Sequence, residues 1–122
     1  LAKDEPSAVS VTERLGRAKS PLAVDELVES LADPRFNVRF EALISAARGG
    51  PVPRLREALV EILRGPEPAL SVVAAWALGR MGDQEAIEPL RAGLDSSYRS
   101  VRAHCARSLA TLGDAEGVPL LL

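Results

Sequence analysis

Three glycines recur along this chain at nearly equal intervals. Gly50, Gly82 and Gly113 are separated by 32 and then by 31 residues. A fixed period of this length is typical of proteins built from stacked structural units, each of which contacts mainly its neighbours. The period therefore predicts a repeat protein. The repeats fall at about residues 21–50, 51–82 and 83–113, and a further one begins at 114–122.

Each period holds two stretches in which apolar residues recur every three or four positions. That spacing places them on one face of a helix. The first stretches carry Val24, Leu27 and Leu31, then Leu55, Leu59 and Ile62, then Ile87, Leu90 and Leu94. The second carry Val38, Ala42 and Ala46, then Leu70, Ala74 and Leu78, then Val101, Cys105 and Leu109. The repeating unit is therefore a helical hairpin, and the small residues of its second helix allow close packing.

The residues at which helices begin and end also repeat. Gly82-Asp83 and Gly113-Asp114 place a glycine that tolerates left-handed backbone beside a carboxylate that can accept free amide hydrogens. Ser20-Pro21 starts the first hairpin, and Asp33-Pro34 and Gly65-Pro66 supply turns inside hairpins. We therefore expect helices at about residues 7–18, 21–32, 35–48, 52–64, 68–81, 84–95 and 98–112, with another beginning at 115–122.

The N-terminal stretch fits the same register when it is shifted by 94 residues. Val11, Leu15 and Ala18 then fall on the positions of Cys105, Leu109 and Leu112. This stretch therefore reads as a second helix without its partner. Aromatic residues are only 3% of the chain, which favours helices over sheets. We predict an all-α protein, an α-solenoid of three to four antiparallel hairpins over residues 21–122, with a capping helix in residues 1–20.

Two runs carry a resemblance to a known family. Residues 74–83 read AAWALGRMGD, residues 108–114 read SLATLGD, and Val101-Arg102 precedes the second run. Over residues 20–122 the chain resembles HEAT repeats, in the short variety seen in phycobilisome-lyase-type proteins. Its period is shorter than the usual HEAT range of about 40–47 residues, and the first repeat has Gly50-Pro51 in place of Gly-Asp. The resemblance implies a protein-binding scaffold or, alternatively, a subunit of a bilin lyase.

A second resemblance rests on residues 13–21, ERLGRAKSP, and on residues 33–40, DPRFNVRF. These runs are similar to soluble HEAT extensions of bacterial major-facilitator transporters. That likeness implies a regulatory extension tethered to a membrane on its cytoplasmic side. The chain itself has no apolar run near the length of about 20 residues that a membrane span requires. We expect a cytoplasmic segment that is a fragment of a larger protein.

The sequence offers little for catalysis. His104 is the only histidine and Cys105 the only cysteine, so a site with several histidine ligands and an internal disulfide are both excluded for this chain. Neighbouring residues on a helix point about 100° apart and do not face each other. Cys105 also occupies the small-residue position held by Ala42 and Ala74, which favours a role in the core. We therefore expect no enzyme activity, no metal and no cofactor.

The binding surface is expected on the second helices, which usually line the concave side of such a stack. Opposite their core stripes lie large apolar groups, and a tryptophan beside an arginine is a frequent composition of protein interfaces. An alternative is that these groups pack against a neighbouring helix. The predicted partner-binding residues are Phe40, Ile44, Arg48, Val72, Val73, Trp76, Arg80, His104 and Arg107.

Nucleic acid is the competing class of partner. The net charge of −2 gives the whole molecule no attraction for phosphates, so any basic surface must be local. Five arginines of the second helices could form such a stripe, although arginines also join neighbouring hairpins through carboxylates in turns. These arginines are Arg39, Arg48, Arg80, Arg102 and Arg107. The charge balance favours a protein partner over nucleic acid.

Overall fold

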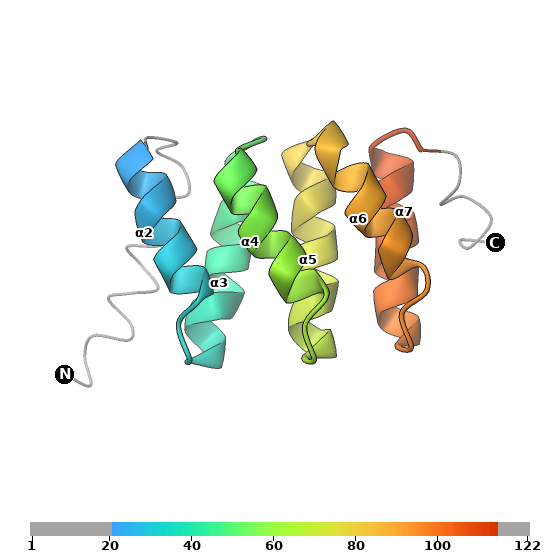
Figure 1. Cartoon of the computed structure of the whole chain (residues 1–122), viewed down its shortest axis with the longest axis horizontal. Helices are drawn as coiled ribbons and strands as arrows, with labels where there is room; N and C mark the ends of the chain where they lie inside the picture. The colour runs from blue at the N-terminus through green and yellow to red at the C-terminus, as the bar shows by residue number, and fades with distance from the viewer. Residues whose placement is uncertain (1–20, 115–122) are drawn as a thin grey trace.

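Three helical hairpins stand side by side in the computed structural model, which describes residues 21–114 (Figure 1). Within these residues no strand forms, so the prediction of an all-α solenoid is confirmed. The predicted helix at 7–18 and the element beginning at 115 lie outside the described residues. The helices are α2 (Pro21–Leu31), α3 (Phe36–Ala47), α4 (Pro53–Leu63), α5 (Pro68–Met81), α6 (Ile87–Gly93) and α7 (Arg99–Thr111), with a 3-10 turn η1 (Gln84–Ala86) before α6.

The helices form two layers. The first helices of the hairpins, α2, α4 and α6, lie in front in Figure 1, and the second helices, α3, α5 and α7, lie behind them. In the second layer α5 packs against α3 on one side and α7 on the other, as well as against its hairpin partner α4. Each unit therefore contacts its neighbours along one axis, as the repeat period predicts.

The helix predicted at 84–95 differs from the observed one in its first turn. Residues 84–86 form the 3-10 turn η1, and regular α-helix starts only at Ile87. Pro89 explains the difference, because it lacks the amide hydrogen that a continuous α-helix would donate to the carbonyl of Glu85. The side chain of Asp83 caps this turn by accepting a 3.0 Å hydrogen bond from the amide of Glu85, which confirms the predicted Gly82-Asp83 boundary.

The repeating glycines take up left-handed backbone between hairpins. The φ angles of Gly50, Gly82 and Gly113 are 78°, 69° and 88°. Residues with a side chain rarely adopt such angles, because the Cβ atom then approaches the following carbonyl oxygen. The period therefore marks the turns that join one hairpin to the next.

The core lies between the two layers and follows the predicted stripes. Leucines of both helix types are fully buried in it, among them Leu59 and Leu90 from the first helices and Leu78 and Leu109 from the second. Ile62, Ile87 and Leu94 are only partly buried and pack at the edge of this core. Cys105 is a core residue, as predicted from its occupying the same repeat position as Ala42 and Ala74.

The second helices approach most closely between α5 and α7. The hydroxyl of Ser108 donates a 2.5 Å hydrogen bond to the main-chain carbonyl of Ala75. One turn further along α5, Gly79 leaves room for Ser108, since a Cβ atom at Gly79 would lie 2.7 Å from the serine Oγ. The small residues of the second helices therefore set the spacing of this layer.

Candidate functional site

A small apolar hollow spans the three second helices. It has a volume of about 240 Å³, and it is formed by one residue of α3, three of α5 and one of α7. These residues are Ile44, Val72, Val73, Trp76 and His104. All five belong to the predicted binding set, so the repeat columns bring together residues that lie 60 positions apart in the sequence.

A second hollow, which we call the basic hollow, adjoins the apolar one between α5 and α7. Its volume is about 230 Å³, and Trp76 and His104 line both hollows. Two arginines give it its charge. The basic hollow is lined by Trp76, Gly79, Arg80, His104, Arg107, Ser108 and Thr111.

Trp76 stands at the junction of the two hollows. Its side chain is 39% exposed, and the guanidinium carbon of Arg80 lies 5.9 Å from the centre of a tryptophan ring. This distance fits a cation–π contact, which holds the arginine over the ring. Val72 and Val73 are instead partly buried against the core. The competing interpretation, packing inside the fold, therefore describes the two valines better than the tryptophan.

Phe40 and Arg48, both predicted to bind the partner, line neither hollow. Phe40 instead stacks on Phe36 one turn earlier in α3, with ring centroids 6.2 Å apart. Arg48 is exposed at the C-terminal end of α3. Phe36 and Tyr98, each 46% exposed, are large apolar surface residues that the repeat columns did not predict. The spacing of four between Phe36 and Phe40 was the signal for their contact.

The polar groups in the basic hollow are already engaged, apart from the guanidinium groups. His104 donates its Nδ1 hydrogen to the carbonyl of Ser100 at 2.8 Å, which leaves Nε2 as an acceptor when the ring is neutral. The hydroxyl of Thr111 donates to the carbonyl of Arg107 at 3.0 Å. Ser108 donates to Ala75. Arg80 and Arg107 are therefore the donors that a ligand in the basic hollow would meet.

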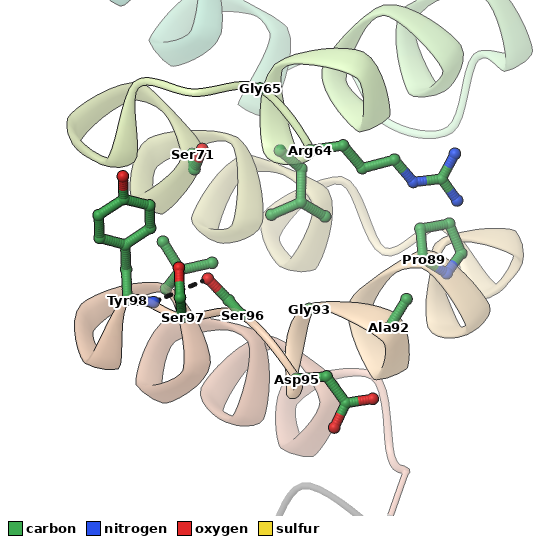
Figure 2. Close-up of a pocket in the computed structure, with 12 residues that line it drawn as sticks. Arg64, Gly65, Ser71, Pro89, Ala92, Gly93, Asp95, Ser96, Ser97 and Tyr98 are labelled. Carbon is green, nitrogen blue, oxygen red and sulfur yellow. Dashed lines mark hydrogen bonds between the residues drawn. The ribbon is translucent and has the colours of Figure 1, made fainter.

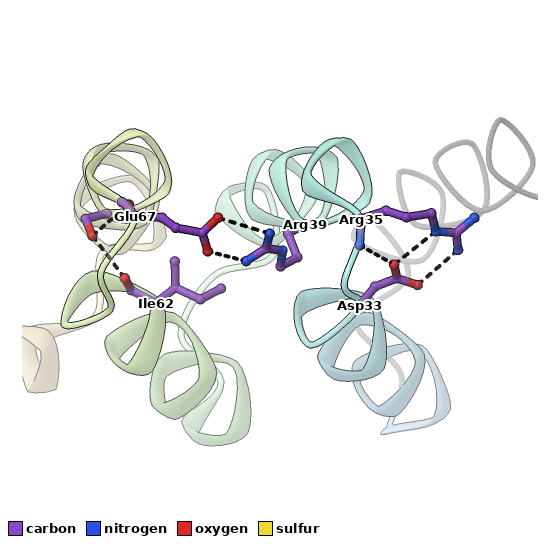
Figure 3. Close-up of polar contacts among 6 residues, drawn as sticks. Asp33, Arg35, Arg39, Ile62 and Glu67 are labelled. Atoms are coloured by element: carbon purple, nitrogen blue, oxygen red, sulfur yellow. Dashed lines mark hydrogen bonds and ion pairs between the residues drawn. The ribbon is translucent and has the colours of Figure 1, made fainter.

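The predicted arginine stripe is interrupted at Arg39 and at Arg102. Arg39 makes two hydrogen bonds to the carboxylate of Glu67, at 2.5 and 3.2 Å, and so joins α3 to the start of α5 (Figure 3). Arg102 donates to the carbonyl of Ser96 at 2.8 Å. These two arginines stabilise the stack instead of facing a phosphate backbone.

Other arginines also join successive parts of the stack through carboxylates. Arg56 of α4 donates to Asp83 at 2.8 Å, and Arg91 of α6 donates to Asp114 at 2.8 Å.

Asp33 accepts three hydrogen bonds from Arg35 within one turn, which lowers the pKa of its carboxyl to about 2 (Figure 3). The side-chain hydrogen bonds of Arg35 are the largest cause of that shift.

A further pocket of about 290 Å³ separates the inner turns of the second and third hairpins (Figure 2). Two of its hydroxyl groups make hydrogen bonds: Ser71 donates to the carbonyl of Ile62 at 3.1 Å, and Ser96 accepts from the amide of Tyr98 at 3.1 Å. No histidine or cysteine lines it. The pocket therefore offers neither a thiol nor an imidazole, and nothing in the sequence pattern predicted it.

Two kinds of reactive group, a metal centre and an exposed thiol, are absent from the described part of the chain. Between residues 21 and 114 no three His, Cys, Asp or Glu side chains gather as metal ligands. Cys105 is completely buried, and this burial raises the pKa of its thiol to about 11. A thiol with such a pKa is almost entirely protonated at neutral pH and is a poor nucleophile.

Comparison with known proteins agrees with the hairpin architecture. No curated protein matches this sequence. Among the helices between residues 21 and 114, none is long and apolar enough to cross a membrane. The likenesses to phycobilisome-lyase-type repeats and to transporter extensions stay predictions. The sequence model of the family described as HEAT repeats matches residues 56–122, more than half of the chain, and the chain therefore belongs to the HEAT repeat family.

Proposed function

We propose that this chain is a non-catalytic scaffold that binds a protein partner on the face formed by α3, α5 and α7. HEAT repeats generally mediate protein–protein interactions, and the family is typically non-catalytic. The observation that carries the choice of face is Trp76, which is partly exposed where the two hollows meet.

The size of the hollows supports a protein partner over a small molecule. Pockets that hold drug-sized ligands or cofactors usually have volumes of about 300–1,000 Å³. The apolar and basic hollows are smaller, at about 240 and 230 Å³. Hollows of this size suit single side chains of a partner that inserts anchors into them, with Trp76 as the wall that both anchors share.

The charge distribution supports the second-helix face over the first-helix face. Glu41 is the only carboxylate on α3, α5 and α7, whereas α2 and α4 together carry several exposed ones. Charged residues are depleted at the centre of protein interfaces, where aromatic residues and arginine are enriched. The surface around Trp76 has that composition. The exposed acidic residues of the first-helix face include Asp25, Glu26, Glu29, Glu57 and Glu61.

A peptide selection tests the proposal directly. A random peptide library displayed on phage is selected against the full chain, and the affinity of each selected peptide is measured by the fluorescence of Trp76, the only tryptophan. Affinity for Trp76→Ala is then measured by calorimetry. Truncation of an interface tryptophan often costs about 2 kcal/mol or more, so we expect binding to weaken about thirtyfold while the fold is retained.

Tyr98→Ala is the matched control, because Tyr98 is an exposed aromatic residue outside both hollows. It should leave the affinity unchanged. Selected peptides that bind Trp76→Ala as tightly as the unaltered chain would contradict the proposal.

A second experiment addresses nucleic acid. Binding to DNA or RNA through phosphates would weaken steeply with rising salt, whereas an apolar interface barely responds. A salt-dependent affinity for DNA that survives Trp76→Ala and is lost in Arg80→Gln/Arg107→Gln would replace the protein partner with nucleic acid.

A further inference from the structure

We infer that the partner segment presents an acidic side chain to Arg80 and Arg107, next to the apolar side chain that enters the hollow of Ile44, Val72 and Val73. This inference rests on the proposed function, since it names the chemistry of the partner on the same face. The distribution of arginines over ion pairs is the first observation that supports it.

Arginines of this protein commonly bind a carboxylate of their own chain. Five of them form ion pairs with carboxylates of the turns or of α2. Arg80 and Arg107 differ, because in the part of the chain that the structure describes neither forms an ion pair. Both are exposed and both line the basic hollow. The five arginine–carboxylate pairs are Arg35–Asp33, Arg39–Glu67, Arg54–Asp25, Arg56–Asp83 and Arg91–Asp114.

The surroundings favour an anion in the basic hollow. Ser108 and Thr111 already donate their hydroxyl hydrogens to main-chain carbonyls, so they would meet a ligand only as acceptors. Arg80 lies over the ring of Trp76, an arrangement that restricts its side chain before any partner arrives. A planar guanidinium matches a carboxylate through two parallel hydrogen bonds. Two such groups beside one hollow therefore select a carboxylate side chain.

The apolar hollow determines the second side chain that the partner must present, an apolar one. It shares Trp76 and His104 with the basic hollow, so the two anchors of the partner must be close together in space. An apolar residue and an aspartate or glutamate a few positions apart on one segment would satisfy both. Because the net charge of the chain is −2, the attraction for an acidic segment must come from this local pair of arginines.

A double-mutant cycle on the selected peptides tests the inference. In each peptide the acidic residue is replaced by its amide, and both forms are measured against the unaltered chain and against Arg80→Gln/Arg107→Gln. Hydrogen bonds between charged groups are among the stronger ones, so the amide change should weaken binding to the unaltered chain about tenfold or more. It should have little effect on the double variant. Arg64→Gln/Arg99→Gln removes the same charge elsewhere and should behave as the unaltered chain.

The failure of the acidic anchor and the failure of the proposed function give different results. If Trp76→Ala abolishes binding but the amide change has no effect, the acidic anchor is wrong and the proposed function stands. If the amide change also has little effect on binding to Arg64→Gln/Arg99→Gln, the overall charge of the chain and not the pair of Arg80 and Arg107 is responsible. The inference is then overturned. Peptides that bind Trp76→Ala as tightly as they bind the unaltered chain overturn the proposed function itself.

Discussion

Ser108 donates its hydroxyl hydrogen to the carbonyl of Ala75 across the α5–α7 contact, at 2.5 Å. This hydrogen bond joins two hairpins through the backbone of one and a small side chain of the other. It requires α5 and α7 to lie close together, and Gly79 provides the space one turn after Ala75. The spacing of the second helices, and with it the shape of the basic hollow, depends on this arrangement.

Gly79→Ala should therefore destabilise the protein. The new Cβ atom would lie 2.9 Å from the Cβ of Ser108, closer than real Cβ atoms come, so the helices must move apart. Overpacking of a close contact typically costs about 1–3 kcal/mol. Chemical denaturation should show a lower midpoint with an unchanged slope.

The combined variant Gly79→Ala/Ser108→Gly is the control for this prediction. It removes the serine side chain that the new methyl group would meet, and it should recover part of the lost stability. If Gly79→Ala alone is as stable as the unaltered chain, the contact between the helices is not as close as described.

Leu78→Asp should unfold the stack. Leu78 is completely buried between the layers, and a buried carboxylate without a partner costs several kcal/mol against a total stability of about 5–15. Circular dichroism should show loss of the cooperative melt. Ser100→Asp, at an exposed position near the start of α7, should keep the melt. A cooperative transition at the original temperature in Leu78→Asp would show that this stripe is not the core.

The fold was predictable because the repeat applies the same physical constraints three times. The left-handed glycines Gly50, Gly82 and Gly113 and the buried leucines recur in register, so each repeat supports the interpretation of the others. What the period did not show was the short 3-10 turn before α6, which depends on the single proline Pro89. A feature present in one repeat alone has no periodic signal.

The candidate site was predictable only in part, because helical columns give direction but not exposure. The column of Ile44, Trp76 and Arg107 does reach the two hollows. The same pattern predicts Phe40 beside them, although Phe40 stacks on Phe36 at another part of α3. It also predicts Arg39 in the basic stripe, whereas Glu67 binds this arginine from a turn 28 residues away. Such pairings depend on side-chain positions that a column does not specify.

The Arg39–Glu67 pair predicts a dependence on pH. The hydrogen bond from Arg39 is the main cause that lowers the pKa of the Glu67 carboxyl below its ordinary value of 4.5. The native state therefore favours the ionised form, and the stabilisation is present above pH 4.5 and lost as the pH falls through the lowered pKa. The melting temperature of the unaltered chain should exceed that of Glu67→Gln at neutral pH, and the two should converge in acid.

Because the pair is exposed, the difference should be small and should shrink in high salt. Glu61→Gln removes an exposed carboxylate of the same hairpin and should show no such convergence. A difference for Glu67→Gln that persists unchanged at low pH would mean that the carboxylate stabilises the protein by something other than its charge.

Cys105 provides a last prediction, on accessibility. The thiol is 0% exposed, and burial raises its pKa from 9.0 to about 11. Since the thiolate is the reactive form, a thiol reagent should label the native chain only as fast as the protein opens, and denaturant should make labelling immediate. The raised pKa also means that stability present below pH 9.0 is lost as the pH rises toward 11. The melting temperature should therefore fall more over that range than in Cys105→Ala. Rapid labelling of the folded chain at neutral pH would contradict the buried position of α7 against α6, where Gly93 leaves space for the sulfur.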